Sequence, residues 1–235
     1  MEKIDKRNGI SADLLKWIAI VTMFIDHVGA AVVEKTNLLY QPNGGMVYFI
    51  LRYIGRLAFP IFCFLLIEGF YHTRNRHRYL CNLLIFALIS ELPFEISFLG
   101  EIVFGFRNVY WTLAIGMIMM LLFEKIKEKN WEKANLWFFL TIAACAILAE
   151  ILHTDYGAIG IILIYILYKL RDVRKQQCIC GAIATAYEIT APIAFLLIYK
   201  YNGVRKQKHL KYFFYAFYPL HLVFLYWIRT LIALY

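Results

Sequence analysis

Charged residues are scarce in this chain. Asp, Glu, Lys and Arg make up 17% of its 235 residues, whereas hydrophobic residues make up 62%. Soluble domains carry about 25% charged residues, so this composition excludes an ordinary soluble domain. The sequence also shows no internal repeat and no connector long enough to be a second domain. We therefore expect residues 1–235 to form one all-α domain, a polytopic helical membrane protein.

Cysteines are few and are poorly placed for cross-linking. The chain has 5, all in or at the ends of apolar segments: Cys63, Cys81, Cys145, Cys178 and Cys180. An odd number placed in this way argues against a disulfide framework. Cys178 and Cys180 lack partners for a zinc site, so we expect packed thiols and no metal.

Long apolar runs are abundant and predict about eight membrane-spanning helices. The predicted spans are 14–33, 47–70, 79–99, 109–123, 137–152, 156–169, 178–199 and 211–233.

Basic residues gather in alternate loops. The N-terminus and the loops at 71–78, 124–133 and 169–175 are rich in Lys and Arg, and the loops between them are not. The positive-inside rule then places the N-terminus in the cytoplasm. It also accounts for the net charge of +9 without a nucleic-acid partner.

The loop at 200–211 breaks this alternation, because it is basic although it should lie outside. Either it departs from the rule, or residues 178–199 form a re-entrant hairpin that returns to the cytoplasm. Glu188 and Pro192 mark the expected break of that hairpin. The sequence leaves both alternatives open.

The first apolar run carries ionisable groups. Asp26 and His27 lie inside it, where translocon scales assign a charged residue a cost of roughly 2.5–3.5 kcal/mol. Lys16 precedes His27 by eleven residues, which at 100° per residue places both on one face about 16 Å apart. His27 is the group here whose proton affinity suits proton transfer near neutral pH. These residues predict a functional site that needs a dry pocket.

Charges in the next two spans lie at similar depth. Arg52 and Arg56 share a helix face at i,i+4 spacing, and so do Glu91 and Glu95. Counted from the ends of their spans, all four match the depth of His27. We expect them to converge around the first helix. The alternative is a set of Arg–carboxylate pairs that only hold helices together.

Two further polar residues, Asn108 and His221, are each open to two interpretations. Asn108 opens the fourth span and can hydrogen-bond either a substrate or a neighbouring helix. His221 lies near mid-depth in the last span, as a second site residue or as a satisfied packing histidine. Asp155 precedes the sixth span, where a capping role is expected.

Together, these residues resemble the TraX family, and the resemblance runs in order over nearly the whole chain. It is carried by Asp13 to Lys16, Ile25 to His27, Leu51 to Pro60, Glu68 to Arg74, Ser90 to Pro93, Asp155 to Ala158, Tyr201 to Gly203 and Tyr218 to His221. The founding member of that family N-acetylates conjugative pilin. More distantly, the basic residue at 16, the ten-residue gap and the histidine at 27 resemble the larger transmembrane acyltransferases.

The resemblance implies transfer of an acetyl group from cytoplasmic acetyl-CoA to an amine, such as a peptide or pilin N-terminus, or to a hydroxyl. His27 would be the general base, oriented by Asp26 or Glu91, and Arg52 or Arg56 would stabilise the oxyanion. Cations would attract the phosphates of acetyl-CoA, and three polar residues would contact the acceptor. The expected phosphate-binding residues are Lys16, Arg74, Arg76 and Arg78, and the expected acceptor-binding residues are Glu95, Asn108 and His221.

Two other classes of function remain open. A proton-coupled transporter would also place Asp, His, Glu and Arg inside spans, although no repeat-related pair of broken helices is present. A non-catalytic membrane assembly factor would explain the hydrophobicity and the paired charges, but not a histidine beside an aspartate at depth.

Overall fold

The structure, a computed structural model, describes residues 9–103, 105–129, 133–205 and 210–234. Parts of the basic N-terminus and of the 124–133 and 200–211 loops lie outside the described residues. The described chain is helical and contains no strand. Its helices are α1 (Ala12–His27), η1 (Val28–Val33), η2 (Asn37–Tyr40), α2 (Gly44–Gly55), α3 (Ala58–His72), α4 (Arg76–Phe98), α5 (Val109–Glu128), α6 (Ala134–Ile151), α7 (Gly157–Lys169), α8 (Arg174–Ala184), η3 (Ala186–Glu188), η4 (Ala191–Ile193), α9 (Ala194–Tyr199) and α10 (Lys211–Ala233).

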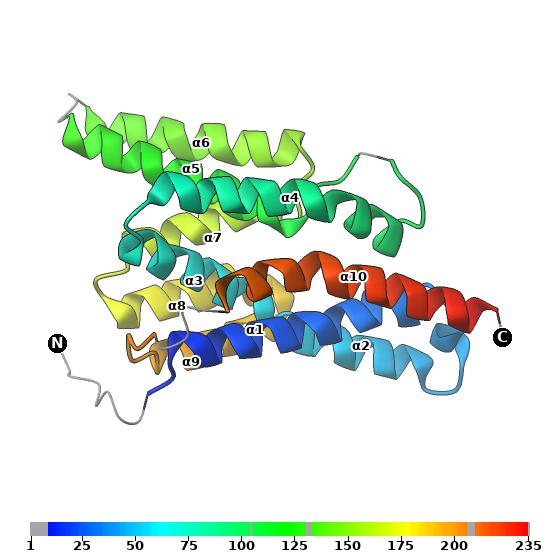
Figure 1. The fold of residues 1–235 in the computed structure, drawn as a ribbon. Coiled ribbons are helices and arrows are strands. Elements are labelled where there is room, and N and C mark those ends of the chain that lie inside the picture. The colour runs from blue at the N-terminus through cyan, green and yellow to red at the C-terminus, as the bar shows by residue number, and fades with distance from the viewer. Residues whose placement is uncertain (1–8, 104, 130–132, 206–209, 235) are drawn as a thin grey trace.

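The long helices lie roughly side by side in one bundle (Figure 1). Helices α1, α2 and α10 form one flank, and α5 and α6 form the opposite flank, with α3 and α7 between them. We call the end at which α1 begins the N-terminal end of the bundle and the opposite end the far end. Since α10 runs parallel to α1, the described chain ends at the far end.

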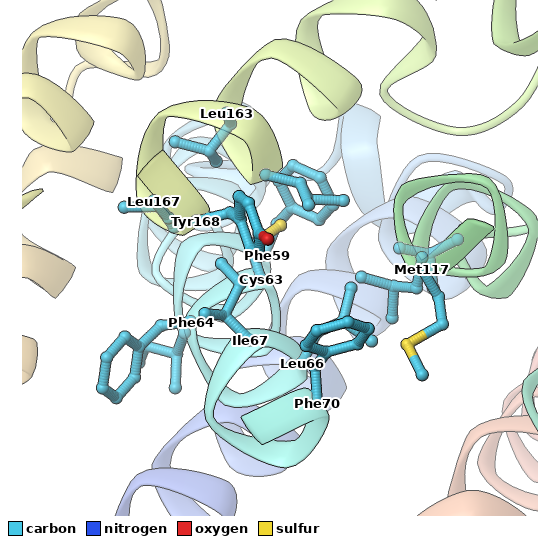
Figure 2. Close-up of a cluster of buried hydrophobic side chains, with 14 of the residues drawn as sticks. Phe59, Cys63, Phe64, Leu66, Ile67, Phe70, Met117, Leu163, Leu167 and Tyr168 are labelled. Carbon is cyan, nitrogen blue, oxygen red and sulfur yellow. The ribbon is translucent and has the colours of Figure 1, made fainter. Parts of the chain in front are cut away.

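Helix α3 is the centre of the core. It is apolar on all sides, as expected of a helix surrounded by protein. Figure 2 shows Phe64 and Phe70 of α3 in a cluster with Met117 of α5 and Leu167 of α7. All four side chains are fully buried. This cluster joins α3 to α5 and α7.

In the described residues, six helical segments are long and apolar enough to cross a membrane, so the chain is a multi-pass membrane protein. These segments are 12–33, 44–72, 76–98, 109–128, 134–151 and 212–233. The sequence predicted about eight. The predicted spans at 156–169 and 178–199 are not among these six, because α7 has only 13 residues and residues 178–199 do not form one helix.

Residues 178–199 form a broken hairpin, as the charge pattern allowed. Helix α8 packs against α9, and a Cβ atom on Gly181 would clash with the Phe195 ring. After the hairpin, the backbone carbonyl of Lys200 accepts a hydrogen bond of 2.8 Å from the amide of Ile10. The hairpin therefore returns to the N-terminal end of the bundle. The re-entrant alternative fits this geometry.

A proline shapes α10 two residues before its histidine. Pro219 has no amide N–H, so the carbonyl of Tyr215 loses its partner within the helix. The hydroxyl of Tyr110 in α5 donates to that carbonyl at 3.0 Å. A neighbouring helix thus satisfies the freed group, as membrane helices require, and this contact anchors α10 next to His221.

Candidate functional site

The candidate site is a cavity of about 250 Å³ toward the far end of the bundle. It lies between α1, α2, α3, α4, α10 and the turn before α7. Its polar and ionisable lining consists of Asp26, His27, Glu34, Lys35, Arg52, Arg56, Asp155, Tyr156 and Tyr218. The sequence did not assign five of these residues to the site: Glu34, Lys35, Asp155, Tyr156 and Tyr218.

Asp26 is the centre of an ion-pair network on one wall of the cavity. Arg52 Nη1 donates to its Oδ2 at 2.5 Å, and Arg56 Nη2 donates to its Oδ1 at 3.1 Å. Arg56 also donates through Nη1 to Glu188 Oε1 at 2.8 Å. The predicted convergence of these two arginines with Asp26 is therefore present. Glu188, at the tip of the hairpin, joins a network to which the sequence did not assign it.

Glycine allows α1 and α2 to approach closely enough for this network. A Cβ atom on Gly55 would overlap the side chain of Asp26, whereas one on Gly45 in the same helix would meet nothing within 4 Å. Helix α2 ends at Gly55, next to Arg56, whose carbonyl cannot accept the usual helical bond because Pro60 lacks an N–H. The break between α2 and α3 therefore lies beside the network.

We predict that Gly55→Ala destabilises the protein and that Gly45→Ala, its matched control, does not. Overpacking of this kind costs about 1–3 kcal/mol, which lowers the Tm of a chain of this size by roughly 2–12 °C. Thermal melts of both variants in detergent measure the difference. Equal melting temperatures for the two variants would show that α1 and α2 are not in such close contact.

His27 is hydrogen-bonded to a second histidine. His27 Nδ1 and His221 Nε2 are 2.6 Å apart, and the two rings are nearly parallel. His221 Nδ1 lies 2.8 Å from the carbonyl oxygen of Phe217, which can only accept. With both rings neutral, His221 donates from Nδ1 and accepts at Nε2, so His27 donates from Nδ1. His27 Nε2 then carries the lone pair that a general base needs.

The backbone after His27 is unusual. Residues 28–33 form a π-helix, η1, rich in small residues. Such segments are wider than an α-helix and are frequent at functional sites. A Cβ atom on Gly29 would lie 3.2 Å from Leu51 Cβ, so the small residue lets α2 pack against η1 next to Arg52. This packing brings Arg52 close to the histidine.

Asp155 lines the cavity instead of capping a helix. Helix α7 begins at Gly157, its cap residue is Tyr156, and Glu150 Oε1 accepts from the amide of Ala158 at 2.7 Å. The expected capping role of Asp155 is therefore wrong. Burial raises the pKa of the Asp155 carboxyl from 3.8 to about 6, while Arg56 and Arg52 oppose the rise.

Glu91 belongs to a separate cluster and does not reach His27. Its Oε1 accepts from Arg107 Nη1 at 2.6 Å, and its Oε2 accepts from Asn108 Nδ2 at 2.9 Å and Trp111 Nε1 at 3.0 Å. The structure thus contradicts the placement of Glu91 beside the histidine, because the face of α4 that carries it points to α5. The residue hydrogen-bonded to His27 is His221 instead.

Glu95 and Asn108 also lie outside the cavity lining. Glu95 is fully buried and accepts from the amide of Val103 at 3.1 Å. Asn108 is the N-cap of α5, accepting from the amide of Tyr110 at 3.1 Å, and donates to the carbonyl of Ala87 at 2.8 Å. Of the expected acceptor-binding residues, the structure brings only His221 to His27.

The expected phosphate-binding cations lie at the N-terminal end, away from the cavity. Lys16 Nζ lies 3.4 Å from Asp13 Oδ1 and 5.4 Å from the centre of the Phe214 ring. Arg76 stacks on the Phe70 ring at 4.1 Å. Arg74 and Arg78 are exposed. In the described part of the chain, no group of three His, Cys, Asp or Glu residues could hold a metal ion.

Comparisons with known proteins find one family. The family model described as "TraX protein" matches residues 11–229. A Dichelobacter nodosus protein named "Probable fimbrial assembly protein FimC, serogroup H1" is 29% identical over 245 residues, covering 92% of this chain and 94% of that protein. An uncharacterized protein of Rickettsia prowazekii is 24% identical over 188 residues, covering 79% of this chain and 66% of that protein. No solved structure matches the chain.

Proposed function

Since this chain belongs to the TraX family, we propose that it is a membrane acetyltransferase that uses acetyl-CoA to acetylate an amine or a hydroxyl. Membership of the family fits a role in modifying or assembling pilin, and the relative from Dichelobacter nodosus is named for fimbrial assembly. On this proposal the acceptor is a peptide amine such as a pilin N-terminus. The protein would lie in the bacterial inner membrane with its N-terminus in the cytoplasm.

The observation that carries the proposal is the pair formed by His27 and His221. A cavity-lining imidazole whose Nδ1 is committed as a donor has Nε2 available to accept a proton. Positioned general bases of this kind contribute roughly 10²- to 10⁴-fold to a reaction. His221 holds the ring and its tautomer, which is the role that Asp plays in the Ser-His-Asp triad.

The two arginines differ in how many donors they have left for a substrate. Arg56 uses Nε, Nη1 and Nη2 for Arg52 O, Glu188 and Asp26 respectively. In the described part of the chain, Arg52 donates only one hydrogen bond, from Nη1 to Asp26. Arg52 therefore has N–H groups free to stabilise an oxyanion at the cavity. Arg56 instead links α2 to α1 and to the hairpin tip.

The cavity suits the reacting end of an acyl-CoA and not the whole molecule. Pockets that enclose drug-sized ligands measure about 300–1,000 Å³, and this one measures about 250 Å³. The acetyl thioester would enter the cavity while the phosphates stay outside. Lys16, Arg74 and Arg78 at the N-terminal end remain the proposed phosphate partners, and Lys16 is about 16 Å along α1 from His27.

The proposal is tested with purified protein in detergent, acetyl-CoA and a panel of amines and alcohols. We expect acetylated product by mass spectrometry and release of one free thiol per product. Detergent micelles hold no proton gradient, so a transporter would give neither signal. If the protein neither binds nor consumes acetyl-CoA, the donor assignment fails and the charges at the cavity must serve transport or assembly.

A further inference from the structure

The charges around the cavity leave one carboxylate in excess. Asp26 is paired with two arginines, and Glu188 is paired with one of the same two. Glu34 accepts from the Tyr48 hydroxyl at 3.0 Å and lies 3.5 Å from Lys35. In the described residues, the Asp155 side chain has neither a hydrogen bond nor an ion pair. Three carboxylates therefore face two guanidinium groups, and the excess negative charge resides on Asp155.

The backbone holds Asp155 in place without using its carboxylate. The amide of Asp155 donates to the carbonyl of Arg107 at 2.7 Å, and its own carbonyl accepts from the Thr112 hydroxyl. The Tyr156 ring stacks on the Phe59 ring with centroids 3.5 Å apart and planes 5° apart. A fixed backbone on both sides leaves the carboxylate free for a ligand in the cavity.

We propose that Asp155 binds the acceptor as its ammonium ion and takes the first of the two protons that this nitrogen must lose. The proposal rests on the acetyltransferase function proposed above and names the residue that selects an amine. A primary ammonium fits because it is compact, positively charged and carries several N–H donors for a carboxylate.

Two proton acceptors are required by the balance of the reaction. Asp155 takes one proton from the ammonium, which frees the lone pair that attacks the thioester carbonyl. As the C–N bond forms, His27 Nε2 takes the second proton, and it passes that proton to the thiolate when the C–S bond breaks. The products are an N-acetylated amine, a free thiol and one proton, which Asp155 releases to solvent.

The pH dependence follows from the same arrangement. Asp155 faces Arg52 of α2, Arg56 directly after α2, Asp26 of α1, Glu188 of η3 and Tyr218 of α10. Its pKa of about 6 means that the carboxylate forms as the pH rises through that value. An α-amino group keeps its positive charge up to about pH 7.7–8.0. Amine binding is therefore expected to be strongest between about pH 6 and 8.

The first experiment measures binding of trialanine amide without any acyl donor, with N-acetylated trialanine amide as the uncharged control. We expect the wild type to bind the free amine more tightly than the acetylated form. Asp155→Asn should weaken binding of the free amine roughly tenfold to a hundredfold, the value of one charge-assisted hydrogen bond. Asp155→Glu should keep part of the wild-type affinity. The matched control Asp172→Asn, at a carboxylate that is 95% exposed, should bind the free amine as tightly as the wild type.

The outcomes separate this proposal from the one on which it rests. Equal binding of the free amine by wild type and Asp155→Asn, with unchanged thermal melts, overturns the role of Asp155. Loss of amine binding in the variant without acetyl transfer by the wild type supports Asp155 and refutes the acetyltransferase. If transfer occurs, its kcat/KM should rise with pH through about 6 in the wild type, and the variant should lack this rise.

Discussion

Replacing His27 by alanine is expected to lower acetyl transfer by roughly 10²- to 10⁴-fold, because the reaction then loses the group that accepts the proton of the attacking nitrogen. The variant should keep its fold, since His27 is only partly buried and its side chain hydrogen-bonds only His221 among the described residues. Product formation by mass spectrometry gives the rate, and a thermal melt in detergent checks the fold.

His77→Ala is the matched control for that experiment. His77 is exposed in the first turn of α4, at the end of the bundle away from the cavity. Its replacement should leave the rate unchanged. A His27→Ala rate within a few-fold of the wild-type rate would remove the general base from the account.

Arg52 and Arg56 lie one helical turn apart but should respond differently to replacement. Arg52→Gln removes the guanidinium that has free N–H donors at the cavity, and loss of one oxyanion donor lowers kcat by roughly 10²- to 10³-fold in other acyl-transfer enzymes. Asp26 keeps Arg56 as a partner in this variant, so the melting temperature should change little.

Arg56→Gln should act mainly on stability. It leaves Glu188 without its ion-pair partner and removes the link between α2 and the hairpin tip. Breaking a buried pair costs up to about 3–5 kcal/mol, and the partial exposure of Arg56 reduces that cost. Kinetics and thermal melts of both variants test the contrast. A larger loss of kcat in Arg56→Gln than in Arg52→Gln, at equal stability, would reverse the assignment.

The sequence predicted the parts of the site that helical periodicity determines. Arg52 and Arg56 had to share a face at i,i+4 spacing, and their depth matched that of Asp26 once the span ends were placed. The network around Asp26 confirms this convergence. The break at Glu188 and Pro192 was one of two alternatives that the sequence left open, because a basic loop followed where the charge rule required a neutral one.

Periodicity sets depth along a helix but not the direction in which its face points. Glu91 matched the depth of His27, yet its face of α4 turns toward Arg107 and Trp111. The contact between His27 and His221 joins residues 194 positions apart, so no local pattern could pair them. Asp155 precedes a helix and matched the signature of a cap, which concealed its place in the cavity.

The most direct test of the account is a structure of the protein with an acetyl-CoA analogue whose thioester is replaced by an unreactive ketone. We expect the carbonyl oxygen of the analogue within hydrogen-bond distance of Arg52, inside the cavity, and His27 Nε2 facing the open space where the acceptor nitrogen must lie. An analogue bound with its acetyl end outside this cavity, away from both residues, would contradict the account.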